Sequence, residues 1–290
     1  MRINHNIAAM VTQSALYTVG KDMNESLEKL STGLRINRAS DDAAGLGVSE
    51  NLRTQINGTA QANRNAQDGI AALTIAEGAA NEVSSILQRM RELAVQTSND
   101  TFTSVERAYS ESEFQALNSE IDRIANVTNY NKQQLLSTTA GRFGAVNVGA
   151  TQSTLWIDAN SRSGIDSITI SIATLNAQSL GIGGAAGSAT LQHLTDQTSS
   201  VNAISSLDGA IDSVNRMRSD MGAYINRLEH AINNLNVSNT NQQSAESLIR
   251  DVDFASETAK FTRNQILTQS GTAMLSQANS LPQSVLSLLK

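Results

Sequence analysis

The two ends of the chain carry apolar residues at the spacing of long amphipathic helices. Near the N-terminus they recur every three or four positions, and near the C-terminus they follow a seven-residue rhythm in which Gly271 fills the one vacant apolar place. A helix of about 30 residues is about 45 Å long, so these elements are rods and not parts of a compact globule. Both ends are therefore predicted to be coiled-coil-like helices that need partners. The positions on the two stripes are Leu16, Val19, Met23, Leu27, Leu30, Leu34, Leu267, Met274, Ala278, Leu281, Val285 and Leu288.

Three segments between the ends also have helical apolar spacing. They run from Asn57 to about Ser98, from about Ser104 to Asn129, and from about Asp196 to Asn236. Ser104 and Arg107 do not make a capping box, although Glu106 suits the first turn of the second segment. The single proline among 290 residues leaves little to interrupt these helices. The three segments are expected to share one core.

A different pattern occupies residues 140–190, which are rich in Gly, Ser and Thr. Residues 168–172 alternate Ile with Thr or Ser, which predicts a half-buried strand, and residues 154–157 are a candidate neighbouring strand. The sequence thus predicts a mainly α chain with long helices and a small β-hairpin at its midpoint.

Nothing in the sequence predicts catalysis or a cofactor. The absence of Cys excludes disulfides and thiolate metal sites, and His5, His193 and His230 lack metal-ligand spacing. Residues 181–186 formally match the start of a dinucleotide-binding loop, but no βαβ unit surrounds them. Asp41, Asp42, Asp251 and Asp253 are candidate acid–base carboxylates, for which solvated or structural roles are the preferred interpretation. We expect no enzyme activity, metal or cofactor. The net charge of −6 argues against nucleic acid, and no apolar run is long enough to span a membrane.

Several stretches at both ends resemble bacterial flagellin. The resemblance covers about the first 137 and the last 100 residues, and the large central insertion of longer flagellins is missing. The stretches are residues 3–6 (INHN), 30–46 (LSTGLRINRASDDAAGL), 87–96 (LQRMRELAVQ), 265–267 (QIL), 271–275 (GTAML) and 277–289 (QANSLPQSVLSLL).

The resemblance implies a hairpin-like filament subunit. Residues 1–45 with 245–290 would form an inner coiled-coil domain that lines the filament channel. Residues 46–139 with 190–244 would form an outer helical bundle, and residues 140–189 a β-rich segment facing outward. Residues 35–56 would connect the layers. The subunit would polymerise into the flagellar filament for motility, with its terminal helices folding on assembly because an isolated chain gains too little burial to offset their ordering.

The resemblance also implies partners and a location. The partners would be further copies of the chain, the flagellar cap and hook–filament junction proteins, an export chaperone and the type III export apparatus. The chain would leave the cell without a cleaved signal, to an external flagellum, with a periplasmic flagellum as the open alternative. Arg89, Leu93 and Glu113 match flagellin positions contacted by Toll-like receptor 5, an innate immune receptor; core packing and ion pairs between subunits are the structural alternative.

Two other functions compete with the filament subunit. A hook–filament junction protein resembles flagellin at both ends, but residues 87–96 and 282–289 favour flagellin. An enzyme grafted onto a flagellin scaffold is disfavoured because the fifty central residues carry no constellation of metal ligands or nucleophiles.

Overall fold

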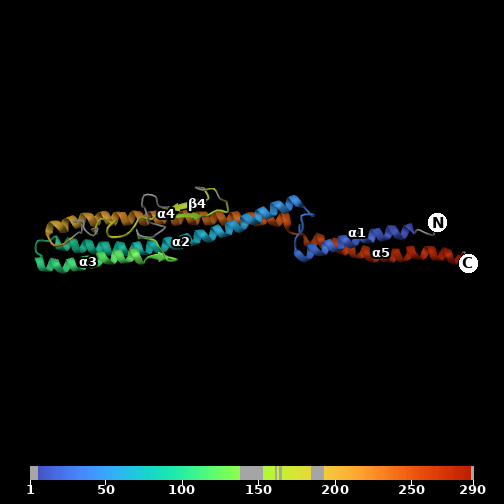
Figure 1. The fold of residues 1–290 in the computed structure, drawn as a ribbon, viewed down its shortest axis with the longest axis horizontal. Coiled ribbons are helices and arrows are strands. Elements are labelled where there is room, and N and C mark those ends of the chain that lie inside the picture. The colour runs from blue at the N-terminus through green and yellow to red at the C-terminus, as the bar shows by residue number, and fades with distance from the viewer. Residues whose placement is uncertain (1–5, 138–152, 161, 163–164, 184–192, 289–290) are drawn as a thin grey trace. The chain divides into compact units, whose positions relative to one another are not determined.

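The computed structural model describes residues 6–137, 153–160, 162, 165–183 and 193–288, and the side chains of residues 281–288 lie outside the described part. Within these ranges the chain is mainly helical (Figure 1). In chain order the elements are α1 (Ile7–Thr32), α2 (Ala43–Thr97), α3 (Ser104–Val127), β1 (Asn129–Tyr130), β2 (Gln133–Gln134), β3 (Ser153–Trp156), β4 (Ser167–Ile170), α4 (Gln197–Arg250) and α5 (Phe254–Leu288). The predicted mainly α fold with a small hairpin is confirmed.

The chain divides into two compact units, and α2 and α4 each contribute to both. Unit 1 comprises Met1–Ile56 and Thr240–Lys290, and unit 2 comprises Asn57–Asn239. The three-part domain division expected from the resemblance stays a prediction.

In unit 1, α1 and α5 lie side by side and antiparallel (Figure 1). The Asn6 side chain caps the first turn of α1 by accepting from the Ala9 amide at 3.1 Å, and its own amide donates to the Ala278 carbonyl at 2.8 Å. Gly33, with φ of 74°, ends α1 in the left-handed conformation that glycine adopts at little cost. The predicted end of this helix at Gly33 is therefore confirmed.

Backbone hydrogen bonds join the C-terminal end of α1 to the segment just before α5, which we call the base of the α1–α5 pair. Leu34 and Asp251 form an antiparallel bridge, and the Val252 amide donates to the Gly33 carbonyl at 3.0 Å. The Asp41 carboxylate accepts from the Asn37 and Arg38 amides at 3.0 and 2.9 Å. Residues 33–42 therefore form an ordered connection, and α2 begins directly after it at Ala43, well before the predicted start at Asn57.

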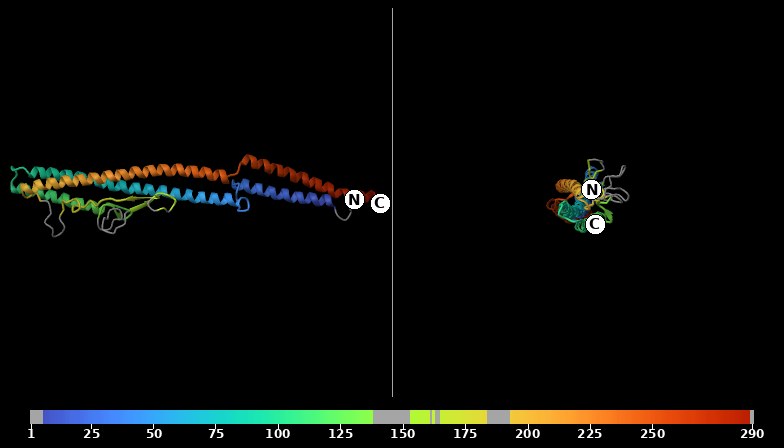
Figure 2. Two further views of the ribbon diagram at one scale, coloured as in Figure 1. Left: turned by 90° about the horizontal axis from the view of Figure 1, so that it is seen from above. Right: turned by 90° about the vertical axis from the view of Figure 1, so that its left-hand side faces the viewer.

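In unit 2, α2, α3 and α4 lie side by side and share the core that their apolar spacing predicted (Figure 2). Each helix contributes fully buried side chains to this core, such as Leu87 from α2, Phe114 from α3 and Leu207 from α4. One boundary differs from the sequence prediction, because α4 continues past Asn236 to Arg250. α3 begins at Ser104 as predicted, and Thr103 caps it through a capping box with Glu106 that the sequence analysis did not identify.

The β-structure consists of two antiparallel pairs. β3 pairs with β4 in the register Leu155↔Ile168, and Ile168 and Ile170 are buried on one face, as their alternation predicted. The β1–β2 pair was not predicted. Asn131 and Lys132 form its two-residue turn, with positive φ values of 48° and 63°. Asn adopts positive φ more readily than most residues, but Lys does not, so the residue types did not indicate this turn.

We predict that Gly58→Ala destabilises unit 2. A Cβ at residue 58 would lie 2.6 Å from the Ala159 Cβ and 3.1 Å from its backbone Cα, so the segment after β3 would have to move. Overpacking of this kind costs about 1 to 3 kcal/mol. Thermal unfolding of the full chain measures the change.

Gly78→Ala is the matched control, because it lies in the same helix with nothing within 4 Å of the new Cβ. It should stabilise the protein by about 0.5 to 1 kcal/mol through helix propensity. Equal effects of the two substitutions would contradict the close approach at Gly58.

Candidate functional site

The facing surfaces of α1 and α5 form a coiled-coil seam. Positions with reduced exposure recur at alternating spacings of three and four on both helices. On α1 they are Leu16, Val19, Met23, Ser26 and Leu30, and on α5 they are Glu257, Phe261, Asn264, Thr268, Gly271, Leu275 and Ala278.

The predicted stripes are only partly in this seam. Leu16, Val19, Met23, Leu30 and Ala278 belong to it, and Leu34 is half-buried in the bridge at its base. Leu27 and Met274 are 55% and 63% exposed, and Leu267 also points away. Leu281, Val285 and Leu288 continue α5, but their side chains lie outside the described residues. The assignment of these residues to self-assembly stays a prediction, and it did not include the seam residues Ser26, Glu257, Phe261 and Leu275. The three–four spacing of these residues was the available signal.

Gly271 provides a hole in the seam. A Cβ at this position would lie 2.6 Å from Leu16 Cδ2 and 3.0 Å from Leu16 Cγ. The Leu16 side chain therefore fills the space that the missing side chain of Gly271 leaves in the seam.

A polar pair lies in the same seam. The Ser26 hydroxyl donates to Glu257 Oε1 at 2.7 Å, and the two residues are 4% and 5% exposed. Lys260 Nζ donates to the other carboxylate oxygen at 3.0 Å. Burial raises the pKa of Glu257, but the hydrogen bonds from Ser26 and Lys260 and the charges of Lys260 and Lys29 outweigh it, so the pKa lies below its ordinary value. The carboxylate is thus held ionised in the seam.

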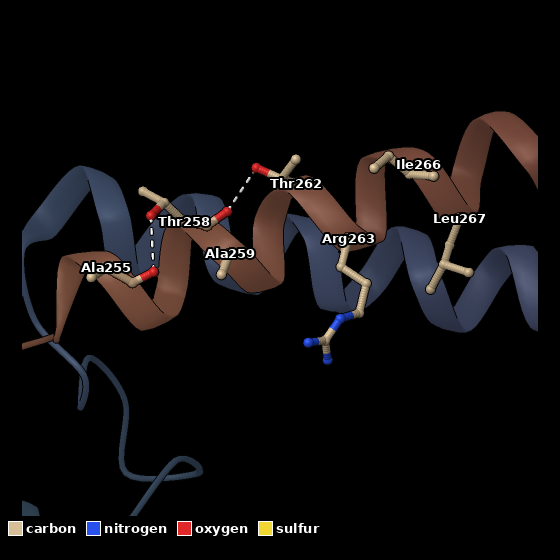
Figure 3. Close-up of a pocket in the computed structure, with 7 residues that line it drawn as sticks. All are labelled: Ala255, Thr258, Ala259, Thr262, Arg263, Ile266 and Leu267. Atoms are coloured by element: carbon tan, nitrogen blue, oxygen red, sulfur yellow. Dashed lines mark hydrogen bonds between the residues drawn. The ribbon is translucent and has the colours of Figure 1, made fainter.

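Both helices also carry exposed apolar side chains outside the seam. On α1, Ile7, Met10, Val11 and Tyr17 are exposed, Tyr17 by 79%. On α5, a shallow groove of about 530 Å³ runs along the helix surface, and Ile266 and Leu267 line one end of it (Figure 3). The remaining lining residues are Ala255, Thr258, Ala259, Thr262 and Arg263. We call these two surfaces the outer faces of α1 and α5; Leu27 and Met274 are counted with them.

The structure places the three candidate receptor-contact residues on neighbouring helices of unit 2. Arg89 on α2 pairs with Glu113 on α3, with 2.9 Å between Nε and Oε1, and with Glu92 at 3.1 Å. Glu113 and Glu92 raise the pKa of Arg89 by hydrogen bonding. Leu93 is 2% exposed and belongs to the core. The two charges therefore lie on the surface, whereas Leu93 is buried in the core.

The remaining sequence candidates are dispersed. His193 bonds Glu111 at 2.7 Å between Nδ1 and Oε1, His230 is exposed on α4, and His5 lies outside the described residues, as do residues 184–186 of the glycine-rich loop. Within the described ranges, no three His, Cys, Asp or Glu side chains gather as metal ligands. No helix in the described part of the chain is long and apolar enough to cross a membrane.

Comparison with known families identifies the chain. Residues 3–140 match the bacterial flagellin N-terminal helical region, and residues 204–289 match the bacterial flagellin C-terminal helical region. The chain belongs to the bacterial flagellins. As a flagellin it is a structural subunit of the flagellar filament.

Full-length relatives have the same short form. This flagellin is 44% identical to flagellin FlaB2 of Treponema pallidum and 45% identical to a flagellin of Halalkalibacterium halodurans, and each match covers all of both chains. A solved structure described as a flagellar hook-associated protein, from Vibrio parahaemolyticus, is 17% identical with a TM-score of 0.56 and covers 72% of this chain and 99% of its own. That likeness shows the fold alone.

We predict that acid weakens the α1–α5 pair through Glu257. Because the folded-state pKa lies below its ordinary value of 4.5, the stabilisation is fully present above that value and is lost as the pH falls below it. The thermal midpoint of the terminal helices, followed by circular dichroism on assembled protein, should fall across this range.

Glu257→Gln is the control, because it keeps a hydrogen-bonding oxygen for Ser26 without a titrating group. Its midpoint should change less with pH than that of the unsubstituted chain. Parallel profiles for the two proteins would show that Glu257 is not the group responsible.

Proposed function

We propose that this flagellin polymerises through the outer faces of α1 and α5. The observation that carries the proposal is the exposure of apolar side chains on both helices of the pair, on the sides that the seam does not cover. Large apolar residues such as Met10, Tyr17, Ile266 and Met274 line these faces. Exposed large apolar side chains that gather on a surface are typical of an interaction site.

The energetics favour assembly over the isolated pair. Ordering the backbone costs roughly 1 to 2 kcal/mol per residue, and burial of one Leu, Ile or Met side chain contributes about 1.5 to 3 kcal/mol. In the isolated pair only the seam residues are buried and contribute to stability. Contacts with neighbouring copies would bury the outer faces as well. A contact between different surfaces of successive copies does not close on itself and generates a helical polymer.

The same balance supports folding of the ends on assembly. We propose that α1 and α5 are ordered stably only in the polymer. We also propose that the cap, the junction proteins, an export chaperone and the type III export apparatus act on the chain before this step.

The filament belongs to the flagellum, outside the cell or in the periplasm, and we propose an external filament. The full-length similarity to flagellins supports these proposals.

We predict that charge on the outer face of α5 stops elongation. Purified chain is added to fragments of assembled protein, and filament length is followed by electron microscopy. Leu267→Glu with Met274→Glu should abolish growth, because two carboxylates would be buried without partners at each contact. Removal of residues 250–290 should have the same result.

Gln265→Glu is the matched control, since it adds a charge at an exposed polar position of the same helix, and it should still elongate. Growth of the double variant at the normal rate would refute the proposed surface. Binding of the unsubstituted chain only to filament ends, without growth, would replace the filament subunit by a junction protein.

We also propose recognition of the unassembled chain by Toll-like receptor 5 in a suitable host. The exposed Arg89–Glu113 pair supports this function, because it presents two charges on adjacent helices at the surface of unit 2. Arg89→Ala with Glu113→Ala should weaken receptor binding about tenfold or more, if the charges are central to the contact.

Arg123→Ala with Glu120→Ala is the matched control, because it removes another exposed ion pair from α3. Binding is measured by titration of the receptor ectodomain. Equal affinities of the two double variants would exclude a role for the Arg89–Glu113 pair.

A further inference from the structure

Two methionines differ from the others in the described part of the chain by their exposure. Met10 on α1 is 62% exposed and Met274 on α5 is 63% exposed, and both lie on the outer faces. The other described methionines are one half-buried in the seam, Met23, and three that are at most 6% exposed in the core of unit 2, Met90, Met217 and Met221. Solvent therefore reaches the two methionines of the outer faces far more than the other four.

Met10 and Met274 belong to segments of the α1–α5 pair that lie alongside each other. The segments are residues 6–16 and residues 271–278. The contacts that join their ends are Asn6 with Ala278 and Leu16 with Gly271. A change at both thioethers would therefore alter one short part of the pair.

The thioethers are the oxidisable groups of this part of the pair. Residues 6–20 and 264–278 contain no Asp, Glu, Lys, Arg, His, Cys or Trp. A peroxide oxidises a thioether without help from a neighbouring group. The sulfur lone pair attacks one peroxide oxygen, the O–O bond breaks, and the other oxygen leaves as water after it takes up a proton. The sulfur is oxidised by two electrons to a sulfoxide, and the peroxide is reduced.

A sulfoxide would change the outer faces where they are apolar and uncharged. Met10 lies between Ile7 and Tyr17, which are also exposed on the outer face of α1. Met274 follows Leu267 by seven residues on the outer face of α5. A sulfoxide oxygen is polar, and burial of a polar group without a hydrogen-bond partner is unfavourable. Side chains that favour burial when reduced would therefore oppose it when oxidised.

We propose that Met10 and Met274 form an oxidation site that controls polymerisation. With reduced thioethers the outer faces bind neighbouring copies, and with sulfoxides they do not. The oxidant is a peroxide. A methionine sulfoxide reductase reverses the change, because it oxidises two thiols to a disulfide and releases the sulfoxide oxygen as water. The inference rests on the proposed function, since it concerns the same surfaces, and the unassembled chain is the sensitive form because neighbouring copies cover both thioethers in the filament.

The first measurement is the oxidation rate of each methionine. The soluble chain and assembled filaments are treated with hydrogen peroxide, and the addition of one oxygen to each methionine peptide is followed by mass spectrometry. In the soluble chain, Met10 and Met274 should react about tenfold or more faster than Met90, Met217 and Met221. In filaments the two outer methionines should react about tenfold or more slowly than in the soluble chain. Equal rates in either comparison would overturn the proposal.

The second measurement is elongation of fragments of assembled protein. The elongation rate of each peroxide-treated chain is divided by the rate of the same chain before treatment. For the unsubstituted chain this ratio should fall to about a tenth or less, because the sulfoxides would have to be buried at each contact. It should recover when the treated chain is incubated with a thiol and the two reductases that act on the two sulfoxide epimers. For Met10→Leu with Met274→Leu, an exchange of similar volume, the ratio should stay near one.

Met217→Leu with Met221→Leu is the matched control, because it makes the same exchange at two buried methionines, and its ratio should fall as in the unsubstituted chain. An unchanged ratio in the unsubstituted chain would overturn the proposal, as would a fall that persists in the chain with Met10→Leu and Met274→Leu. If that variant does not elongate even before treatment, the reductases decide, since a loss that they do not reverse overturns the proposal. Failure of the untreated, unsubstituted chain to elongate would instead refute the proposed assembly, and the oxidation rates in the soluble chain would still test the site.

Discussion

The pairing of the chain's two ends is the interaction on which the assembly account depends. α1 and α5 are far apart in sequence, yet the seam, the Asn6 contact with Ala278 and the bridge at Leu34 bring them side by side. Closing so long a loop is entropically unfavourable, and the seam has few large apolar residues to offset it. We propose that neighbouring copies complete the pair by burying the exposed apolar residues of its outer faces.

Unit 2 differs from the terminal pair in how it is stabilised. Its three helices bury a continuous core that includes Leu87, Phe114 and Leu207, and the β3–β4 hairpin adds Ile168 and Ile170. This unit therefore has a continuous core within one chain, although Val105 and Tyr109 are exposed on its surface. The contrast suits our proposal that the ends of unit 1 gain most from neighbouring copies.

Sequence periodicity predicted the helices and the β3–β4 hairpin, because these depend on local spacing. It placed the start of α2 at Asn57, whereas the helix begins at Ala43. Gly58 lies inside this helix, where its missing side chain makes room for Ala159. Periodicity also did not single out Ser26, which lies beside Leu27 and is buried against Glu257. Apolar spacing identifies hydrophobic stripes, whereas a polar pair in the seam becomes visible only with the partner helix in place.

Hydrogen exchange measured by mass spectrometry on the soluble chain and on filaments grown from it tests the central claim most directly. If the ends are completed by neighbouring copies, amides of residues 7–32 and 254–288 exchange rapidly in the soluble chain and become protected in the filament, while amides of α2, α3 and α4 in unit 2 are protected in both. Equal protection of the terminal helices in the two states would contradict the account, because the pair would then be complete in a single chain.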